Sequence, residues 1–271
     1  MSEADAIADT DAPATIATLT ADLAALGDLA GETVLVHSSL SALGFVAGGP
    51  QAVVEALLAW LGPHGTLVVP TFSTHLSDPA RWQAPPVPES WWPILRDQMP
   101  AFDPDLTPTR QMGVVADTVR AHPQARRSAH PLHSFAAVGP AAERLVSRHE
   151  LDFGLTEGSP LVGLHELDAW VLLLGVGHAN NTSLHLAEHR ASITGQQVIR
   201  QGSPVWVDGR RRWVTYDELD VDAEDFAELG AAFGTTGDQR EGRVGAGTAL
   251  LMRQRAVVTF GVDWLGAHRP R

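Results

Sequence analysis

Two short, mostly apolar runs separated by a helix-like segment constrain the fold of this chain more than any other feature. The runs TVLVH at 33–37 and TLVVP at 66–70 have the length of buried strands. Between them, Gly48-Gly49-Pro50 precedes apolar residues at helical spacing through 53–61. The order strand, helix, strand predicts a parallel pair within an α/β sheet. A third apolar run, WVLLLGV at 170–176, predicts a further buried strand.

The remaining segments predict an insertion and a hairpin. Residues 73–110 are rich in Pro and carry Trp82, Trp91 and Trp92. A long loop of this kind is either a lid or wall of a binding site or a structural arm. Residues 200–216 predict a β-hairpin that turns at Asp208-Gly209, and residues 222–233 predict an acidic helix. Farther along, we expect a Gly-rich turn at 242–247 and a helix at 249–255.

The composition excludes several kinds of chemistry. The chain of 271 residues has no Cys, so disulfides, thiolate catalysis and Cys-ligated zinc are excluded. It has no Lys, so all 19 basic residues are Arg, and the formal net charge is −13. Because an acidic surface repels nucleic acid and anionic membranes, we expect neither as a partner. A polycationic substrate is compatible with this charge.

The N-terminal region predicts no targeting segment. Residues 1–12 are small, polar and acidic, so we expect them to be disordered. They lack the basic and apolar regions of a secretory signal, and no apolar run reaches the ~18 residues that span a bilayer. We therefore expect a cytoplasmic protein in which residues 13–271 form one domain, as a monomer or a homodimer.

Two polar segments are candidates for anion binding. His37-Ser38-Ser39-Leu40 follows the first strand directly, where hydroxyl groups and free backbone N–H groups can hold phosphates. Turn formation and a helix cap are the alternative. Arg126-Arg127-Ser128 is the second candidate, since the planar guanidinium of Arg donates two hydrogen bonds to a phosphate at once. Here the alternative is a solvated turn.

A third segment, HLAEH at 185–189, has the H-x-x-E-H pattern of inverted zinc peptidases. On a helix, His185, Glu188 and His189 share one face. The pattern therefore predicts either a zinc site or a single catalytic His with an orienting carboxylate. A helix without any catalytic role also remains open. The position after a buried strand and the Gly/Asn-rich loop at 175–183 favours an active site.

The acidic stretch after the hairpin contains Asp217, Glu218, Asp220, Asp222, Glu224, Asp225 and Glu228. Most of these residues are typical of an exposed helix face. A subset near His185 would hold its imidazole ring or bind the ammonium groups of a substrate.

Taken together, these segments resemble the aminoglycoside 3-N-acetyltransferase family. The resemblance runs through VLVHSSLSALGFVAGGPQAVVEALLAWLGPHGTLVVPTFS at 34–73, LSDPARWQAPPVPESWW at 76–92 and MPAFDPDLTPTRQMGVVADTVR at 99–120. It continues through RSAHPLHSFAAVGPAAERL at 127–145 and GSPLVGLHELDAWVLLLGVGHANNTSLHLAEHR at 158–190. It covers most of residues 31–233.

The resemblance implies a fold distinct from that of the GNAT acyltransferases. This fold is a single α/β domain with a central, largely parallel mixed sheet flanked by helices, plus the Pro/Trp-rich insertion and the β-hairpin. It also implies acetyl-CoA as the co-substrate. The implied acceptor is the 3-amino group of the 2-deoxystreptamine ring of an aminoglycoside antibiotic, and the implied consequence is antibiotic resistance.

The same resemblance implies roles for individual residues. The cofactor-binding residues are expected to be His37, Ser38, Ser39, Leu40, Arg127, Ser128, Ser134 and Phe135. The catalytic residues are expected to be His185 as the general base, with Glu218 and Asp220. The substrate-binding residues are expected to be Asp78, Glu188, Glu218 and Asp220.

One departure bears on the zinc hypothesis. The family usually has a residue other than His after HLAE, so His189 is expected to be incidental and no metal is expected. In the route we expect, the substrate amine attacks the acetyl carbonyl directly and His185 accepts its proton. Three alternatives remain: an acetyltransferase for a different amine, with fewer acceptor carboxylates; a zinc hydrolase using His185, Glu188 and His189; and an inactive aminoglycoside-binding protein.

Overall fold

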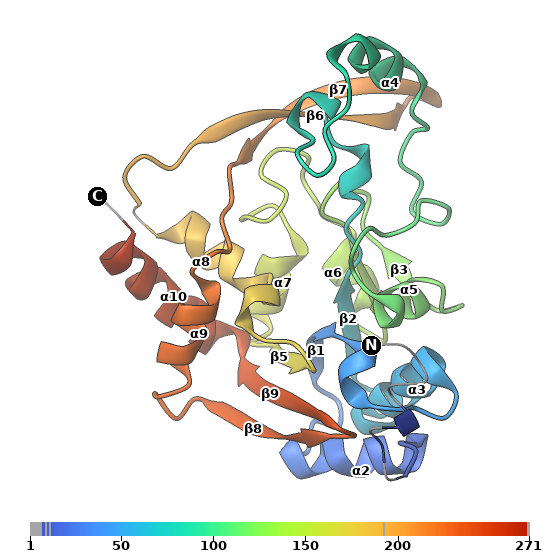
Figure 1. The fold of residues 1–271 in the computed structure, drawn as a ribbon, viewed down its shortest axis with the longest axis vertical. Helices are drawn as coiled ribbons and strands as arrows, with labels where there is room; N and C mark the ends of the chain where they lie inside the picture. Colours follow the sequence, from blue (N-terminus) through green and yellow to red (C-terminus); the bar gives the residue numbers. More distant parts are fainter. Residues whose placement is uncertain (1–6, 9, 11, 192, 270–271) are drawn as a thin grey trace.

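The computed structural model describes residues 7–8, 10, 12–191 and 193–269. A seven-stranded sheet with the strand order β3-β4-β2-β1-β5-β9-β8 forms its centre (Figure 1). The strands are β1 (Thr33–Ser38), β2 (Thr66–Pro70), β3 (Arg126–Arg127), β4 (Phe135–Val138), β5 (Trp170–Leu174), β8 (Gln239–Val244) and β9 (Gly247–Arg253). The expected α/β architecture with a mixed sheet is confirmed. Its parallel pairs, β1 with β2 and β1 with β5, are confined to the centre, and the outer pairs are antiparallel.

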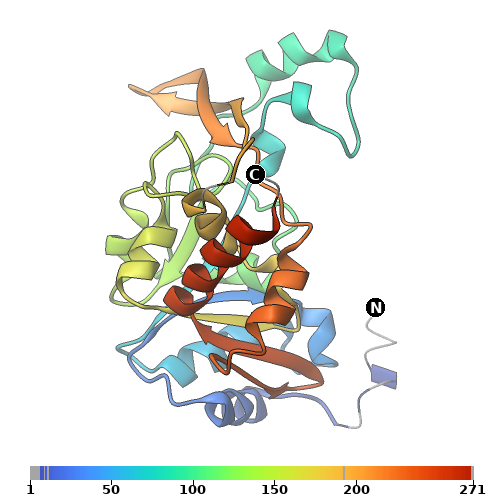
Figure 2. The same cartoon turned by 90° about the vertical axis from the view of Figure 1, so that its left-hand side faces the viewer.

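The central strands are apolar because both faces of the sheet are covered. Along β1, Val34 and Val36 point into one core and Leu35 points into the other. The first core lies under α2 (Ile16–Leu26), α3 (Gly49–Leu61) and α5 (Val114–Arg120). The second lies under α6 (Ala142–Val146), α7 (Pro160–Glu166), α8 (Ser183–Arg190), α9 (Phe226–Phe233) and α10 (Gln254–His268). In Figure 2, α9 and α10 face the viewer.

The Pro/Trp-rich insertion and the hairpin lie together at one end of the molecule in both views (Figures 1 and 2). The insertion forms η2 (Thr74–Leu76), η3 (Pro79–Arg81), η4 (Glu89–Trp91) and α4 (Trp92–Gln98). The predicted hairpin is confirmed as β6 (Val198–Val207) and β7 (Arg210–Leu219). Arg211 Nε donates to Met99 O at 2.7 Å, and the Phe102 N–H donates to Pro204 O at 2.9 Å. The insertion is therefore bonded along the hairpin.

The helix predicted at 249–255 is wrong. Residues 249–253 belong to β9, which lies between β5 and β8, and the helix α10 begins only at Gln254. Ala, Leu and Met favour helices, but pairing with two neighbouring strands outweighs this local preference. The predicted turn at 242–247 is the end of β8 and the tight connection to β9, where Gly245 has φ 58°.

The structure bears in part on two expectations, the disorder of the N-terminal residues and the absence of a membrane-spanning segment. The disorder expected for residues 1–12 falls largely outside the described residues, although Thr10 Oγ1 accepts a hydrogen bond from the Phe45 N–H at 3.1 Å. Within the described part of the chain, none of the helices combines the length and the apolar character that crossing a membrane requires.

Candidate active site

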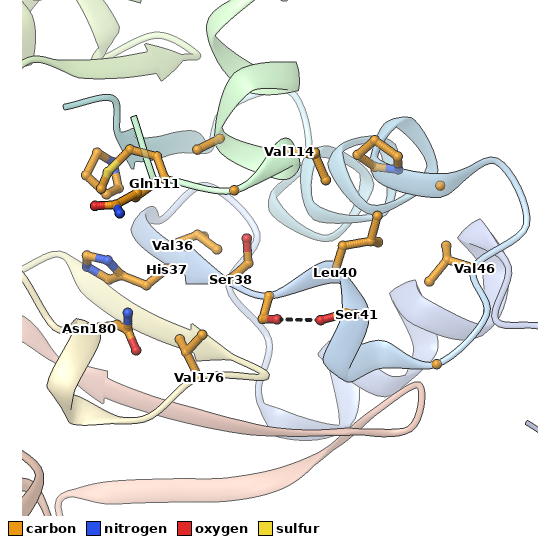
Figure 3. A pocket seen from close by; sticks show the side chains of 18 of the residues that line it. Val36, His37, Ser38, Leu40, Ser41, Val46, Gln111, Val114, Val176 and Asn180 are labelled. Atoms are coloured by element: carbon orange, nitrogen blue, oxygen red, sulfur yellow. Dashed lines mark hydrogen bonds between the residues drawn. The ribbon is translucent and has the colours of Figure 1, made fainter. Parts of the chain in front are cut away.

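A pocket of about 760 Å³ opens where the carboxyl ends of β1 and β2 meet the N-termini of α3 and α5 (Figure 3). This edge of the parallel strands is where α/β proteins place their ligands. The lining residues are Val36, His37, Ser38, Ser39, Leu40, Ser41, Gly44, Phe45, Val46, Gly49, Pro50, Pro70, Gln111, Met112, Gly113, Val114, Ala116, Val176, Asn180 and Thr182. This lining contains hydroxyl, amide and apolar groups, with His37 as its one ionisable side chain.

Four of the predicted cofactor residues, His37, Ser38, Ser39 and Leu40, line this pocket. The Ser39 N–H donates to Leu174 O of the neighbouring strand at 2.9 Å, which holds the turn against β5. Burial and the charge of His185 lower the pKa of His37 to about 3, so its ring is neutral. The far end of the pocket reaches the N-terminus of α3, where Gly48 adopts a left-handed conformation with φ 90°.

The other four predicted cofactor residues lie elsewhere. Arg127 uses every nitrogen of its guanidinium within the protein. The acceptors are Thr71 Oγ1 and Ser134 Oγ for Nε, Pro104 O and Thr107 O for Nη1, and Thr71 O and Ser73 Oγ for Nη2. Burial lowers its pKa to about 10. Arg127 therefore ties the insertion to the sheet, and in this arrangement it does not present a free fork to a phosphate.

The neighbours of Arg127 are also structural. Ser128, Ser134 and Phe135 are buried, and Ser128 Oγ accepts a hydrogen bond from the Phe135 N–H at 2.9 Å. Ser134 Oγ donates to Thr71 O at 2.8 Å. Basic residues beside hydroxyl residues suggested an anion site in the sequence. In the structure, these side chains form hydrogen bonds within the protein instead.

His185 and Glu188 form a dyad on α8. His185 Nδ1 lies 3.0 Å from Glu188 Oε2, and the Glu188 side chain is only 1% exposed. An ionised carboxylate only accepts hydrogen bonds, so the imidazole proton lies on Nδ1 and Nε2 keeps a lone pair. Burial would raise the pKa of Glu188, but the hydrogen bond from His185 and the other partners outweigh it and lower the pKa. The dyad therefore leaves Nε2 of the imidazole free to accept a proton.

The second oxygen of Glu188 is fully engaged. Oε1 accepts from the Asp222 N–H at 2.9 Å and from Arg269 Nη1 at 2.5 Å. A buried carboxylate with these partners is inaccessible to an aminoglycoside, so the expectation that Glu188 contacts the substrate is corrected. Sequence reasoning missed Arg269, since no motif surrounds it.

Glu218 lies in a different cluster from the dyad. Its Oε1 accepts from the Gly154 N–H at 2.9 Å and lies 3.5 Å from His130 Nε2 and 3.6 Å from His133 Nδ1. Burial would raise the pKa of Glu218, but the contacts with the two histidines outweigh it and lower the pKa to about 2. This carboxylate joins the hairpin to the segment that follows β3, and its contacts lie inside the protein.

The remaining predicted acceptor carboxylates are paired with Arg. Asp78 Oδ1 accepts from Arg96 Nη2 at 2.7 Å and from the Ala80 N–H at 3.0 Å, which caps η3. Asp220 Oδ1 lies 3.2 Å from Arg81 Nη2, and its side chain is 56% exposed. Of the two, Asp220 is the more open to solvent.

The structure does not bring His185, Glu188 and His189 together as ligands of one zinc ion. His185 Nδ1 is bonded to Glu188, and the ring of His189 lies beside Phe153, with centroids 6.5 Å apart. Within the described residues, the one cluster of three possible ligands within 4.8 Å is His130, His133 and Glu218.

The proton position on His130 argues against a metal in that cluster. His130 Nδ1 accepts from the N–H groups of Leu132 and His133 at 3.1 and 3.0 Å, so the ring proton lies on Nε2. Nε2 then donates to Leu151 O at 3.1 Å. A metal-bound His needs a proton on its other nitrogen, and here two donors already occupy that position.

Comparison with known proteins decides the family. The aminoglycoside 3-N-acetyltransferase family matches residues 35–266. This chain belongs to the aminoglycoside 3-N-acetyltransferase family. A relative in Bacillus subtilis (strain 168), the SPbeta prophage-derived aminoglycoside N(3')-acetyltransferase-like protein YokD, is 43% identical over 259 residues, covering 95% of this chain and 94% of its own. The crystal structure of YokD has a TM-score of 0.93 at 42% identity and covers 96% of each chain.

Two further structures of this acetyltransferase family contain ligands. The AAC-IIIb binary complex with CoASH has a TM-score of 0.84 at 33% identity and covers 96% of this chain and all of its own. AAC-VIa bound to sisomicin has a TM-score of 0.86 at 29% identity with the same coverage. The resemblance inferred from the sequence is thus confirmed at the level of family and fold.

Proposed function

We propose that the protein transfers the acetyl group of acetyl-CoA to an amino group, with the 3-amino group of the 2-deoxystreptamine ring of an aminoglycoside as the acceptor. The observation that carries the proposal is the His185–Glu188 dyad. In it, Nδ1 of His185 lies 3.0 Å from Glu188 Oε2, and Nε2 of His185 keeps its lone pair. The dyad lies one helical turn beyond Thr182, which lines the pocket. The proposed base, His185, therefore lies next to the pocket proposed for acetyl-CoA.

The pocket suits the pantetheine arm of acetyl-CoA. Its walls are apolar or carry neutral hydroxyl and amide groups, matching a chain of amides and methylenes. The backbone at the N-terminus of α3 offers N–H groups and a positive dipole end to the phosphates. The AAC-IIIb relative that binds CoASH supports this assignment. Arg127, Ser128, Ser134 and Phe135 are omitted from it because of their internal bonds.

The reaction is a direct transfer. The acceptor nitrogen attacks the thioester carbonyl, a C–N bond forms, and the carbonyl electron pair moves to oxygen. His185 Nε2 takes the proton from the attacking nitrogen, and Glu188 stabilises the resulting imidazolium. The C–S bond then breaks, and the same proton passes from His185 to the departing CoA sulfur. The products are the N-acetylated acceptor and CoASH.

The aminoglycoside acceptor is supported by the family and by the relative bound to sisomicin. Acetylation would remove one positive charge from the drug, which is how resistance would follow. A specific observation also favours a second candidate, an amine with fewer charges. Asp78 and Asp220 form ion pairs with Arg96 and Arg81, and Glu218 is buried beside two histidines. Fewer free carboxylates suit fewer ammonium groups.

The test is thiol release from acetyl-CoA by metal-free protein, with a panel of aminoglycosides and of monoamines. His185→Ala should abolish release while acetyl-CoA binding, measured by calorimetry, survives. His189→Ala is the matched control on the same helix and should retain activity. Release with monoamines alone would replace the aminoglycoside by the second candidate. Unchanged turnover in His185→Ala would refute the proposed base. So would loss of both bound metal and activity in His189→Ala when wild type and variant are purified without chelator.

A further inference from the structure

Arg269, which follows α10, closes a chain of ion pairs behind the dyad. Its Nη1 donates to Glu188 Oε1 at 2.5 Å. Its Nε and Nη2 donate to the two oxygens of Asp225 at 2.8 and 2.7 Å, a two-point contact that fixes the plane of the guanidinium. Nη2 also donates to Asp222 O at 2.6 Å. Three segments, α8, the loop before α9 and the end of α10, are joined at this one side chain.

The chain of ion pairs is shielded from water. The side chains of Arg269 and Glu188 are 14% and 1% exposed. The ring of Phe226 packs against both His185 and Arg269. Its centroid lies 5.0 Å from that of the His185 ring and 5.9 Å from the guanidinium carbon of Arg269. Salt and solvent screen such interactions less than they screen contacts between exposed charges, so the charge of Arg269 acts on the dyad.

We propose that Arg269 is a positioning residue for the general base: it orients Glu188 and sets the charge that Glu188 presents to His185. The proposal rests on the proposed function, because it assigns His185 as the base. Glu188 has two oxygens with separate tasks. Oε2 holds His185 Nδ1, and Oε1 is held by Arg269 and the Asp222 N–H. Asp225 in turn orients Arg269.

The direction of the effect on proton binding follows from the charges around the dyad. Those that face it are Glu188 on α8, Arg269 after α10, Asp225 before α9 and His37 on β1, which is neutral. Removing the positive charge of Arg269 leaves the pair His185–Glu188 more negative. The pair then keeps its proton to higher pH, whichever of the two residues carries it. The pair therefore stays protonated, and unable to accept a proton from the substrate amine, over a wider range of acidic pH.

The experiment compares Arg269→Gln, Arg269→Lys and Arg255→Gln. Arg255 lies on α10 and is 51% exposed at the side chain. Its Nη2 donates to His165 O and Glu166 O, and its Nε lies 3.8 Å from Asp168 Oδ1, so it is a matched control. We expect Arg269→Gln to lower kcat about 10- to 100-fold, the range seen when a partner that orients a functional group is removed. KM for acetyl-CoA should stay within about twofold. The acid limb of the pH–rate profile should move to higher pH. Arg269→Lys should restore the limb but only part of kcat, because an ammonium keeps the charge and loses the two-point contact.

Melting temperatures and imidazole NMR separate positioning from folding and from the proposed function. In the wild type, the His185 Nδ1–H resonance should be protected from exchange, and in folded Arg269→Gln it should shift or disappear. This readout needs no acceptor, so it stands even if the acceptor or the acetyl transfer were wrong. If Arg269→Gln unfolds, the same readouts are made on Arg269→Lys and Asp225→Asn. A folded variant with unchanged kcat, acid limb and His185 resonance would overturn the proposal. So would a loss of kcat that only follows the loss of folded protein.

Discussion

His185 and Glu188 lie one turn apart on the same helix, with Nδ1 of the first 3.0 Å from Oε2 of the second. The carboxylate that contacts His185 is therefore the one within the HLAEH pattern, and Glu218, which was also expected near His185, lies in a separate cluster. This has a mechanical consequence, because a pair on one helix moves as a unit. The 3.0 Å contact therefore needs no residue of the hairpin or of the insertion.

The dyad predicts a large effect of Glu188→Gln. The amide has nearly the same shape but no charge, so it cannot stabilise the imidazolium that forms during transfer. We expect kcat to fall by about 100-fold or more, within the range attributed to general base catalysis. Binding of acetyl-CoA, measured by calorimetry, should be unaffected because Glu188 does not line the pocket. A kcat within twofold of the wild type would show that Glu188 does not assist the base.

Arg127→Met should affect stability and leave donor binding intact. The substitution removes hydrogen bonds to Thr71, Ser73, Thr107 and Ser134, and leaves several buried oxygens without a donor. Each unsatisfied buried group costs about 1–3 kcal/mol, so we expect the free energy of unfolding to fall by about 3–5 kcal/mol. Urea unfolding measures this loss. An unchanged unfolding curve combined with a tenfold higher KM for acetyl-CoA would instead return Arg127 to the cofactor site.

The parts of the fold that the sequence predicts are those in which local pattern and tertiary environment agree. The apolar runs of β1, β2 and β5 predict buried parallel strands because both faces of each strand are covered. β9 was not predicted, since its Ala, Leu and Met residues favour a helix and only its neighbours in the sheet make it a strand. The turn at 37–40 was recognised because a strand end fixes where its side chains lie.

The parts of the site that escaped prediction depend on contacts between distant residues. Arg269 and Glu188 are 81 residues apart, and no local pattern brings them together. Arg127 resembles a phosphate ligand in sequence, but its acceptors come from a strand end 56 residues before it and from the insertion. Composition identifies groups able to bind an anion. The three-dimensional structure decides whether their hydrogen bonds are already used.

The buried histidines predict that stability falls in mild acid. Burial lowers the pKa of His149 well below its usual value of 6.5, and the neighbouring His130 lowers it further. The unfolded chain therefore binds this proton at a higher pH than the folded protein does. The free energy of unfolding should decrease as the pH falls below about 6.5. Glu218, with its pKa lowered to about 2, adds a second loss as the pH falls from about 4.5 to 2.

His149→Gln isolates the first of these effects. The variant has no histidine at this position that binds a proton only when the protein unfolds. The slope of the free energy of unfolding against pH below 6.5 should therefore decrease by up to about 1.4 kcal/mol per pH unit. Urea unfolding at a series of pH values gives the slope. His64→Gln is the control, because His64 lies exposed in the turn between α3 and β2. Equal slopes in His149→Gln and the wild type would mean that His149 is protonated in the folded protein.

Val114 offers a way to block the pocket without disturbing the core. It begins α5, lines the pocket and is 52% exposed, so a larger side chain there meets solvent and pocket space instead of packed atoms. We expect Val114→Trp to raise KM for acetyl-CoA about tenfold or more, equivalent to at least about 1.4 kcal/mol of lost binding. The melting temperature should change little. Thr118→Trp, one turn farther along the same helix and outside this lining, should leave KM unchanged. If Val114→Trp also leaves KM unchanged, acetyl-CoA must bind elsewhere, and the base would have to be sought beside that second site.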